Sequence, residues 1–293
     1  MKREMKRIVK QCLSVGKDSV RFVLFFMEML LRSGLHDPFK RKYQGKVAVL
    51  ANGPSLKGVL PKLQSEEFAG TDFIVMNYIG KEEGFTRIKP RRYCLADPMF
   101  FYSGHREKEA RSLFSLLNEA VDWDMNLYIP KGSVKYFKSF SALSNPYIHL
   151  VPLNIINYKG FECFRNFFYK HGLSMPLVNS VAIMAIFVGI NSGYKQIDLY
   201  GVDHNFFESI YVNENNQLCN RETHFYDKDE VTLKPILRYE NSQVLKVGDY
   251  IIGIGGIFIG HDLLAAYARH RNVRIVNCTE CSMIDSYERK KYL

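Results

Sequence analysis

The sequence predicts an α/β fold with a Rossmann-like, mostly parallel sheet flanked by helices. Short apolar runs recur along the chain, and several of them end at a small polar residue. These runs are almost continuously apolar, as expected of parallel strands that are covered on both faces. The chain has 293 residues, 47% of them hydrophobic, which is enough for one large core.

Before the first strand, Met1–Gly34 is predicted to form a helix that is basic at its start and apolar at its end. The apolar run Phe22–Leu31 is shorter than the roughly 20 residues that span a bilayer. A basic amphipathic helix that carries Phe22, Phe25 and Phe26 is typical of an interfacial membrane anchor. The alternative is a helix packed on the core or on a second subunit.

Three successive predicted strands end in polar side chains. The first, Val47–Leu50, breaks into the turn Asn52-Gly53-Pro54-Ser55, whose serine is suited to cap a following helix. The next two end at Asn77 and Asp97. Because the carboxyl ends of parallel strands meet at one edge of a sheet, we expect these polar residues to lie together along that edge.

The middle of the chain continues the alternation of helices and strands. Periodicity predicts helices over residues 56–68 and Glu107–Ala120, and Met125–Pro130 is a fourth strand. Residues 134–171 are aromatic and loop-like; core packing is the common role of such a cluster, with a helix face or a lid over a pocket as alternatives. The cluster consists of Phe161, Phe164, Phe167, Phe168 and Tyr169.

A further α/β unit follows. The pair Asn179-Ser180 is suited to cap the apolar helix Val181–Gly189, which leads through a glycine turn to a central strand, Ile197–Asp203. This strand closes on Gly201-Val202-Asp203. The unit therefore adds Ser180 and Asp203 to the same crevice at the sheet edge.

The last part of the chain begins with a polar stretch that contains His224-Phe225-Tyr226-Asp227. After the glycine-rich, apolar residues 251–259, Gly260-His261 is expected to open a helix over Asp262–Arg271, before a last strand, Val273–Asn277. The predicted organisation is a basic amphipathic helix over residues 1–34, a Rossmann-like domain over residues 46–203 and 251–293, and a lid or excursion over residues 204–250.

Composition indicates an anionic partner. The 40 basic and 30 acidic residues give a net charge of +10, which suits a nucleotide, a phosphorylated lipid or a membrane surface. Nucleic acid is not expected, because the sequence has no zinc finger, no aromatic RNP-like box and no basic base-reading helix. Of the six cysteines, the only close pair is Cys278 and Cys281, and buried thiols are favoured over zinc because no second pair accompanies it.

Taken in order, the motifs of this chain resemble those of the bacterial sialyltransferases of glycosyltransferase family 42. The motifs extend from residue 46 to about residue 285, some four fifths of the chain. They are Asn52-Gly53-Pro54-Ser55-Leu56, Asn77, Asp97-Pro98-Met99-Phe100-Phe101, Asn179-Ser180, Gly201-Val202-Asp203 and Gly260-His261.

The resemblance implies a Rossmann-like variant of the GT-A fold and a CMP-activated, sialic-acid-like sugar as donor. It also implies that no metal and no cofactor is required, and that a lid closes over the donor. The acceptor would be a cell-surface glycan or glycolipid, such as lipooligosaccharide, lipopolysaccharide or capsule. The expected location is the cytoplasm, peripheral on the inner face of the cytoplasmic membrane through residues 1–33, with a homo-oligomer left open.

By the same resemblance, each motif acquires an expected role. Asn52 and Ser55 would hold the phosphate and ribose region of the donor, and Asp203 the cytidine. The departing phosphate would be assisted by Tyr226 or His224, and His261 would be the general base. The remaining members of the donor-binding set are Gly53, Asn77, Asp97, Asn179, Ser180 and Gly201.

Departures from the family pattern concern the donor and the membrane. The family usually has asparagine where Asp97 stands and often an arginine near Leu177, which leaves the identity of the donor sugar open. The basic helix at the amino end is an addition, because the family members attach to membranes through their other end.

The chemistry of sugar transfer is compatible with these roles. A histidine with its ordinary pKa of about 6.5 can take a proton from an acceptor hydroxyl near neutrality. At the start of a helix, the ring of His261 is predicted to be neutral because the positive helix end disfavours imidazolium.

Two other function classes stay open, whereas a metal-dependent glycosyltransferase is not expected. Asp122-Trp123-Asp124 and Asp227-Lys228-Asp229 have the Asp-x-Asp form of metal-dependent glycosyltransferases, but neither directly follows an apolar strand. A pterin-type pyrophosphokinase that uses ATP and magnesium is the alternative enzyme, because it shares a similar Gly-Pro-Ser turn. A non-catalytic membrane-surface module, with a crevice that binds no nucleotide, is the third possibility.

Overall fold

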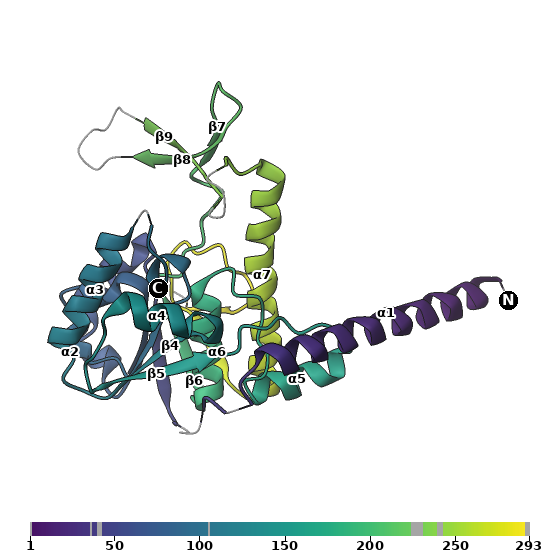
Figure 1. The fold of residues 1–293 in the computed structure, drawn as a ribbon, viewed down its shortest axis with the longest axis horizontal. Helices are drawn as coiled ribbons and strands as arrows, with labels where there is room; N and C mark the ends of the chain where they lie inside the picture. Colours follow the sequence, from purple (N-terminus) through teal and green to yellow (C-terminus); the bar gives the residue numbers. More distant parts are fainter. Residues whose placement is uncertain are drawn as a thin grey trace.

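A computed structural model describes residues 2–35, 37–39, 43–104, 106–223, 231–238 and 243–290 of the chain. Its centre is an eight-stranded sheet in which every paired strand is parallel (Figure 1). The predicted α/β, Rossmann-like fold is therefore confirmed. The strands are β1 (Lys46–Leu50), β2 (Asp72–Met76), β3 (Arg92–Cys94), β4 (Met125–Pro130), β5 (Ile148–Leu153), β6 (Gln196–Tyr200), β10 (Arg274–Asn277) and β11 (Glu288–Arg289).

The strand order makes β1 the turning point of the sheet. The order is β11-β10-β6-β1-β2-β3-β4-β5, so the chain first builds outward from β1 in one direction and later continues on its other side. In the register, Val47 lies between Asp72 of β2 and Ile197 of β6. The carboxyl ends of β1 and β6 therefore form a topological switch point, where open α/β sheets bind ligands.

Helices cover both faces of the sheet, which explains why the strands are apolar throughout. On one face, Val47 and Val49 pack in one core with α6 (Val181–Ser192) and α7 (Val247–His270). On the other face, Ala48 and Leu50 pack in a second core with helices that lie on the opposite side of the molecule (Figure 1). These helices are α2 (Phe85–Ile88), α3 (Glu107–Ala120) and α4 (Val134–Ser141).

The predicted helix over residues 56–68 is wrong. Three short 3-10 helices, η1 (Pro54–Gly58), η2 (Leu60–Lys62) and η3 (Glu66–Phe68), occupy this stretch. Gly58 is a poor helix former, and Pro61 has no backbone N–H to continue an α-helical ladder. The other 3-10 helices follow strand ends: η4 (Asn77–Lys81), η5 (Pro98–Phe100) and η6 (Lys131–Ser133).

The interpretation of residues 134–171 as loop-like is also wrong, because α4, β5 and α5 (Glu162–Lys170) form there. Pro152 within β5 argues against a strand in the sequence, but β5 is the edge strand of the sheet, where proline is tolerated. The aromatic cluster is divided between the core and the surface. Tyr169 is fully buried, whereas Phe164 and Phe167 are exposed.

A third correction concerns α7, which is one continuous helix rather than a glycine-rich segment followed by a helix. Glycine is a weak helix former, but here it permits close packing. A Cβ atom at Gly256 would lie 2.5 Å from Nδ2 of Asn179, and one at Gly260 would lie 2.5 Å from Cδ1 of Ile183. His261 consequently lies in the middle of α7, not at its start.

Among the described residues, α7 is the helix that is long and apolar enough to cross a membrane, judged by length and composition alone. Of its most apolar stretch, 44% is buried inside the molecule, where α7 packs on α6 and β10. Core helices of globular proteins meet the same criterion, so this finding does not distinguish a spanning helix from a core helix.

The amino-terminal helix, α1 (Lys2–Arg32), projects from the body of the protein (Figure 1). Its second half packs on the segment around α5, where Phe25 contacts Tyr158 and Phe168 at ring-centroid distances of 4.8 and 5.0 Å. Phe22 joins the same cluster. The prediction of a helix is confirmed, but the assignment of Phe22 and Phe25 to a membrane-facing surface is wrong, because this face of α1 covers the protein.

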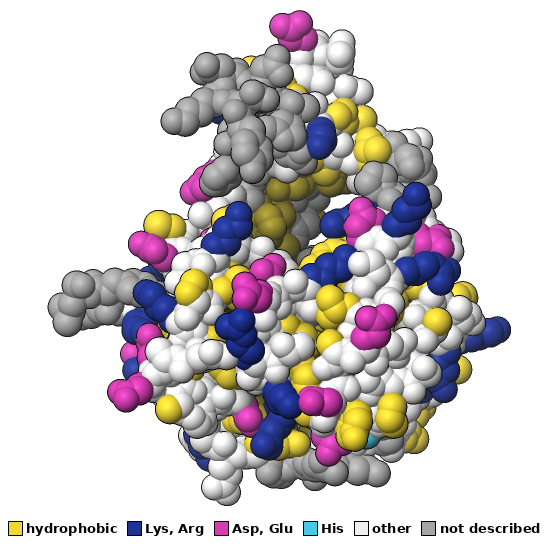
Figure 2. Space-filling model, turned by 90° about the vertical axis from the view of Figure 1, so that its left-hand side faces the viewer, with side chains coloured by type: hydrophobic (Ala, Val, Ile, Leu, Met, Phe, Trp, Pro, Cys, Tyr) yellow, Lys and Arg dark blue, Asp and Glu magenta, His cyan; other side chains and the backbone are white. Residues whose placement is uncertain are grey.

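A second, antiparallel sheet lies above the carboxyl edge of the large sheet (Figure 1). It is formed between β6 and α7 by β7 (Ile210–Val212), β8 (Leu218–Thr223) and β9 (Val231–Pro235). Figure 2 shows the molecule hollowed below this small sheet. The excursion predicted over residues 204–250 therefore contains regular structure, and its end overlaps the beginning of α7.

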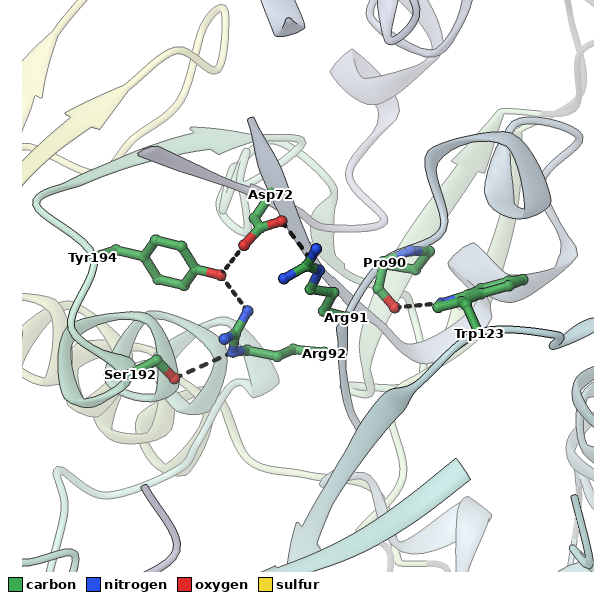
Figure 3. A network of polar contacts seen from close by, with 7 residues as sticks. All are labelled: Asp72, Pro90, Arg91, Arg92, Trp123, Ser192 and Tyr194. Carbon is green, nitrogen blue, oxygen red and sulfur yellow. Dashed lines mark hydrogen bonds and ion pairs between the residues drawn. The ribbon is translucent and has the colours of Figure 1, made fainter. Parts of the chain in front are cut away.

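The opposite, amino edge of the large sheet carries a buried polar network, in which only Nη2 of Arg92 has no hydrogen-bond partner among the described residues (Figure 3). Arg92 is fully buried and donates from Nε to Oγ of Ser192 at 3.2 Å and from Nη1 to the hydroxyl of Tyr194. That hydroxyl donates to Oδ2 of Asp72 at 2.5 Å. The guanidinium also lies over the ring of Tyr43, 3.9 Å from its centroid. The network ties the end of α6 to β2 and β3.

Candidate functional site

A cleft of about 880 Å³ opens at the switch point between β1 and β6. Of the residues predicted to bind a donor, it brings together Asn52, Gly53, Asn77, Ser180, Gly201 and Asp203. The sequence-based expectation that these turns meet at one sheet edge is thus met for six positions. The cleft is also lined by Ala51, Pro54, Met76, Val181, Ala182, His204, Asn205, Phe206, Glu208, Ser209 and Arg221.

Two glycines allow the turns after β1 and β6 to touch. The backbone N–H of Gly53 donates to the carbonyl of Gly201 at 2.8 Å. A Cβ atom at Gly53 would lie 1.8 Å from Oδ2 of Asp203, and one at Gly201 would lie 2.2 Å from the carbonyl oxygen of Ala51. Gly201 also has φ of +70°, which glycine adopts without strain. Both positions therefore require glycine.

The carboxylate of Asp203 binds the first turn of η1. Oδ2 accepts from the hydroxyl of Ser55 at 2.9 Å, and Oδ1 accepts from its backbone N–H at 3.3 Å. The hydroxyl of Ser55 is therefore engaged by Asp203 in this structure, and Ser55 is not among the residues that line the cleft. Asp203 lines the cleft and also holds its floor in place.

Two asparagines of the cleft have an unpartnered amide oxygen. Oδ1 of Asn77 and Oδ1 of Asn205 are buried and have no hydrogen-bond partner among the residues that the structure describes. Asn77 also has a left-handed backbone, with φ of +48°, and the hydroxyl of Tyr93 donates to its carbonyl oxygen. Buried polar groups are normally paired, so these amides indicate a place where a ligand completes the hydrogen bonding.

One wall of the cleft is the amino end of α6. Oγ of Ser180 accepts from the N–H of Ala182 at 3.3 Å and caps the helix, as predicted. The remaining N–H groups of the first turn and the helix dipole favour an anion at this position. Arg221 of β8 lines the same cleft and adds a positive charge from the small sheet. This combination suits a phosphate group.

Besides Ser55, two residues of the predicted donor-binding set, Asp97 and Asn179, lie outside the cleft. Oδ1 of Asp97 accepts from the N–H of Met99 at 3.2 Å and caps η5. Nδ2 of Asn179 donates to the carbonyl of Gly253 at 3.3 Å, which ties the entry of α6 to α7. A second hollow, of about 630 Å³, lies farther along the same edge and is lined by residues that follow β3, β4 and β5 and by Arg32 at the end of α1.

His261 reaches the cleft only through another histidine. It is fully buried, and its Nε2 lies 3.1 Å from Nε2 of His204, which lines the cleft. Its Nδ1 lies 2.9 Å from the hydroxyl of Tyr287. His204 itself has φ of +53° and stacks on Phe206, with ring centroids 5.0 Å apart.

Burial determines the charge of both rings. It lowers the pKa of His204 to about 4. Burial, and then the neighbouring His204, lower the pKa of His261 to about 3. Both imidazoles are therefore neutral at pH 7. The neutral ring predicted for His261 is found, but its cause is desolvation and not a helix start, because His261 lies in mid-helix.

The remaining sequence candidates either lie outside the described residues or pair elsewhere. His224 and Tyr226, with the triplet Asp227-Lys228-Asp229, lie outside the described residues. Asp122 pairs with Lys89 at 2.8 Å and Asp124 with His149 at 2.9 Å, in the segment that precedes β4. Within the described ranges, no group of three or more His, Cys, Asp or Glu side chains is placed to bind a metal ion.

Sequence reasoning missed five polar residues of the cleft: His204, Asn205, Glu208, Ser209 and Arg221. The first two directly follow Asp203, so the signal was their position immediately beyond a strand that ends in a predicted binding turn. Arg221 comes from β8 of the small sheet, and only the folded arrangement brings it to the cleft.

No family model and no curated protein sequence matches this chain. Among solved structures, the chain is similar to the MAf glycosyltransferase from Magnetospirillum magneticum AMB-1, with a TM-score of 0.46 and 13% sequence identity. The match covers 88% of this chain and 35% of that protein, so the chain spans about a third of its length. A similarity of this size does not indicate a function.

Proposed function

We propose that this protein is a glycosyltransferase that moves a CMP-activated, sialic-acid-like sugar onto a cell-surface glycan or glycolipid. The observation that carries the proposal is the polar cleft at the switch point, which is lined by the amino end of α6 and by Asn77 and Asn205, whose Oδ1 atoms have no hydrogen-bond partner among the described residues. The ordered motifs that resemble family 42 support CMP as the nucleotide. Support for glycosyl transfer comes from the same resemblance.

The donor is oriented by the two sides of the cleft. Its phosphate lies against the first turn of α6, near Ser180 and Arg221, because these groups supply N–H donors and positive charge. Its nucleoside lies toward Asn52 and Asn77, whose amides can pair with the ribose and base. Asp203 acts chiefly by holding Ser55 and the turn after β1. The chemistry proposed here requires no metal and no cofactor.

The general base is the pair His204 and His261, with His204 toward the acceptor. His261 is fully buried and both of its ring nitrogens contact protein groups. In the catalytic tautomers, Nδ1–H of His261 donates to Tyr287, and Nε2–H of His204 donates to Nε2 of His261. This leaves Nδ1 of His204 unprotonated. It can take the proton of the acceptor hydroxyl while His261 stabilises the resulting imidazolium.

Departure of CMP is assisted by positive charge and by the small sheet. Arg221 lies on that sheet and lines the cleft, so closure of β7–β9 over the donor would bring it nearer the leaving phosphate. His224 and Tyr226 keep their proposed role in the same step. We place the protein in the cytoplasm, at the inner face of the cytoplasmic membrane.

The experiment is incubation of the purified chain with a panel of CMP-sugars and glycan acceptors, with release of CMP followed by mass spectrometry. We expect acceptor-dependent CMP release with one class of CMP-sugar and none with UDP- or GDP-sugars. A parallel thermal-shift comparison of CMP with ATP and magnesium tests the pyrophosphokinase alternative. Stabilisation by ATP and magnesium alone, with no CMP release from any sugar, would contradict the proposal.

A further inference from the structure

The helix α1 has two apolar faces, and only one of them covers the protein. Phe25 and Met29, with Phe22 beside them, pack on the body. A second row of large apolar side chains is spaced three and four residues apart along the helix and remains 47–86% exposed. We call this row the outer stripe. It consists of Val20, Val23, Leu24, Met27, Leu30 and Leu31.

The outer stripe lies on the side of α1 opposite to the packed face. At 3.6 residues per turn, Leu24 and Leu31 are about half a turn away from Phe22 and Met29. Single exposed apolar residues are common on proteins, but a continuous exposed row marks an interaction surface. Because the packed face holds α1 on the body, the outer stripe can be engaged without disturbing the core.

Charged residues accompany the stripe. Lys17, Arg21 and Arg32 are on the same helix, and Arg32 pairs with Glu28 at 2.6 Å. The first 34 residues contain eight Lys or Arg and three Asp or Glu, which gives +5 of the net +10 of the chain; residues 2–10, which precede the stripe, carry +4 of this charge. The helix thus combines an apolar row with a strong excess of positive charge.

We propose that the outer stripe docks on the surface of an anionic lipid bilayer, with α1 lying in the interface. Apolar side chains enter the boundary between head groups and acyl chains, while the basic residues pair with lipid phosphates. A second copy of the chain fits less well, because it would bring two +5 segments together. Insertion of α1 across the bilayer does not fit either, because α1 is not apolar on all sides. Among the described helices, α7 and not α1 is long and apolar enough to span a membrane.

This docking is independent of the proposed sugar transfer and of the donor cleft. The proposed docking surface differs from the one expected from the sequence, in which Phe22, Phe25 and Phe26 lie in the membrane interface. Arg32, at the end of α1, also lines the second hollow.

The test is co-sedimentation of the full chain with vesicles of phosphatidylcholine alone or mixed with phosphatidylglycerol. The variant is Leu24→Asp with Met27→Asp. The matched control is Tyr211→Asp with Val212→Asp, which adds the same charges at exposed apolar residues of β7. We expect wild type and control to bind the anionic vesicles equally and the α1 variant to bind at least about tenfold more weakly. Binding of wild type should weaken several-fold between about 0.1 M and 0.5 M salt.

Light scattering in solution and circular dichroism accompany the binding assay. Since the substituted side chains are exposed, the melting temperature of the variants should change little. Leu31→Asp, at an 86% exposed position, serves as a second variant. Equal sedimentation of the α1 variants and wild type would overturn the proposal. The proposal would also be overturned if wild type does not bind vesicles but forms a dimer in solution, and the α1 variants are monomers.

Discussion

The polar residues at the two ends of β2 differ in whether their side chains have hydrogen-bond partners. At its amino end, Asp72 belongs to a hydrogen-bonded network with Tyr194 and the buried Arg92 (Figure 3). Just beyond its carboxyl end, Asn77 has a left-handed backbone and a buried amide oxygen that no described residue satisfies. Only a few residues of one strand separate the two environments.

This difference indicates that residues important for stability lie at the amino edge of the sheet and residues important for function at its carboxyl edge. At the amino edge, most polar groups are paired with one another, although Nη2 of Arg92 has no hydrogen-bond partner among the described residues, and their replacement should destabilise the fold. At the carboxyl edge, unpartnered groups and left-handed residues are retained, and their replacement should cost activity more than stability. The predictions below test whether the two edges are as separate as this comparison requires.

The largest effect is expected at the carboxyl edge. His204→Ala removes the ring that lines the cleft, so transfer to the acceptor should fall by about 10²–10⁴-fold, the range for a positioned acid–base group. Binding of CMP and the melting temperature should change little. The measurement is the transfer rate at saturating donor, with His261→Ala and Tyr287→Phe for comparison.

A rate close to that of wild type in His204→Ala, together with a large loss in His261→Ala, would restore His261 as the direct base. A large loss of transfer rate in Tyr287→Phe would instead show that the histidine pair depends on the hydroxyl of Tyr287, which contacts His261.

The next effect is expected at the amino edge. Arg92→Ala leaves Asp72 and Tyr194 without their buried cation and should lower the free energy of unfolding by about 3–5 kcal/mol. Arg91→Ala is the matched control; its side chain is 58% exposed and contacts Asp72 at 3.6 Å, so it should cost less than about 1 kcal/mol. Denaturant unfolding measures both. Similar values for the two variants would show that the network of Figure 3 contributes no more than a surface pair.

Acid should destabilise the protein through the histidine pair. The pKa values of His204 and His261 are lowered to about 4 and about 3, whereas an unfolded histidine has a pKa of about 6.5. Between these pKa values the unfolded state binds more protons than the folded state. The contribution of the pair to the free energy of unfolding is therefore fully present above about pH 6.5 and decreases by on the order of 1–3 kcal/mol as the pH falls toward 4.

Denaturant midpoints at pH 7.5 and 4.5 measure this effect, and His204→Gln is the comparison. The variant should lose part of the dependence, since one lowered pKa is removed. An unchanged pH dependence would place the acid sensitivity elsewhere in the chain.

The sequence predicted the sheet edge well because the local signals were strong there. Val47–Leu50 is continuously apolar and ends in a turn that contains Gly53, whose close contact with Gly201 no other residue would permit. The cap of α6 by Ser180 was likewise visible in the sequence. These features depend on neighbouring residues and on the general geometry of parallel sheets.

The errors came from packing between distant segments. The glycines of α7 led us to expect the helix only from Gly260-His261 onward, but Gly256 and Gly260 allow the longer helix to approach Asn179 and Ile183. His204 was overlooked because only folding brings it to His261, 57 positions away. Phe25 was assigned to the membrane because its contacts on the body are equally invisible in the sequence.

Calorimetric titration of CMP tests the central claim, that the cleft at the switch point is the donor site. We expect wild type to bind one CMP, and Asn52→Ala and Asp203→Ala to bind it about ten- to a hundredfold more weakly, because the first loses a hydrogen bond to the donor and the second releases Ser55 and the turn after β1. Arg91→Ala, at the amino edge, should bind CMP as wild type does. No binding of CMP to wild type, or unchanged affinity in both cleft variants, would contradict the claim.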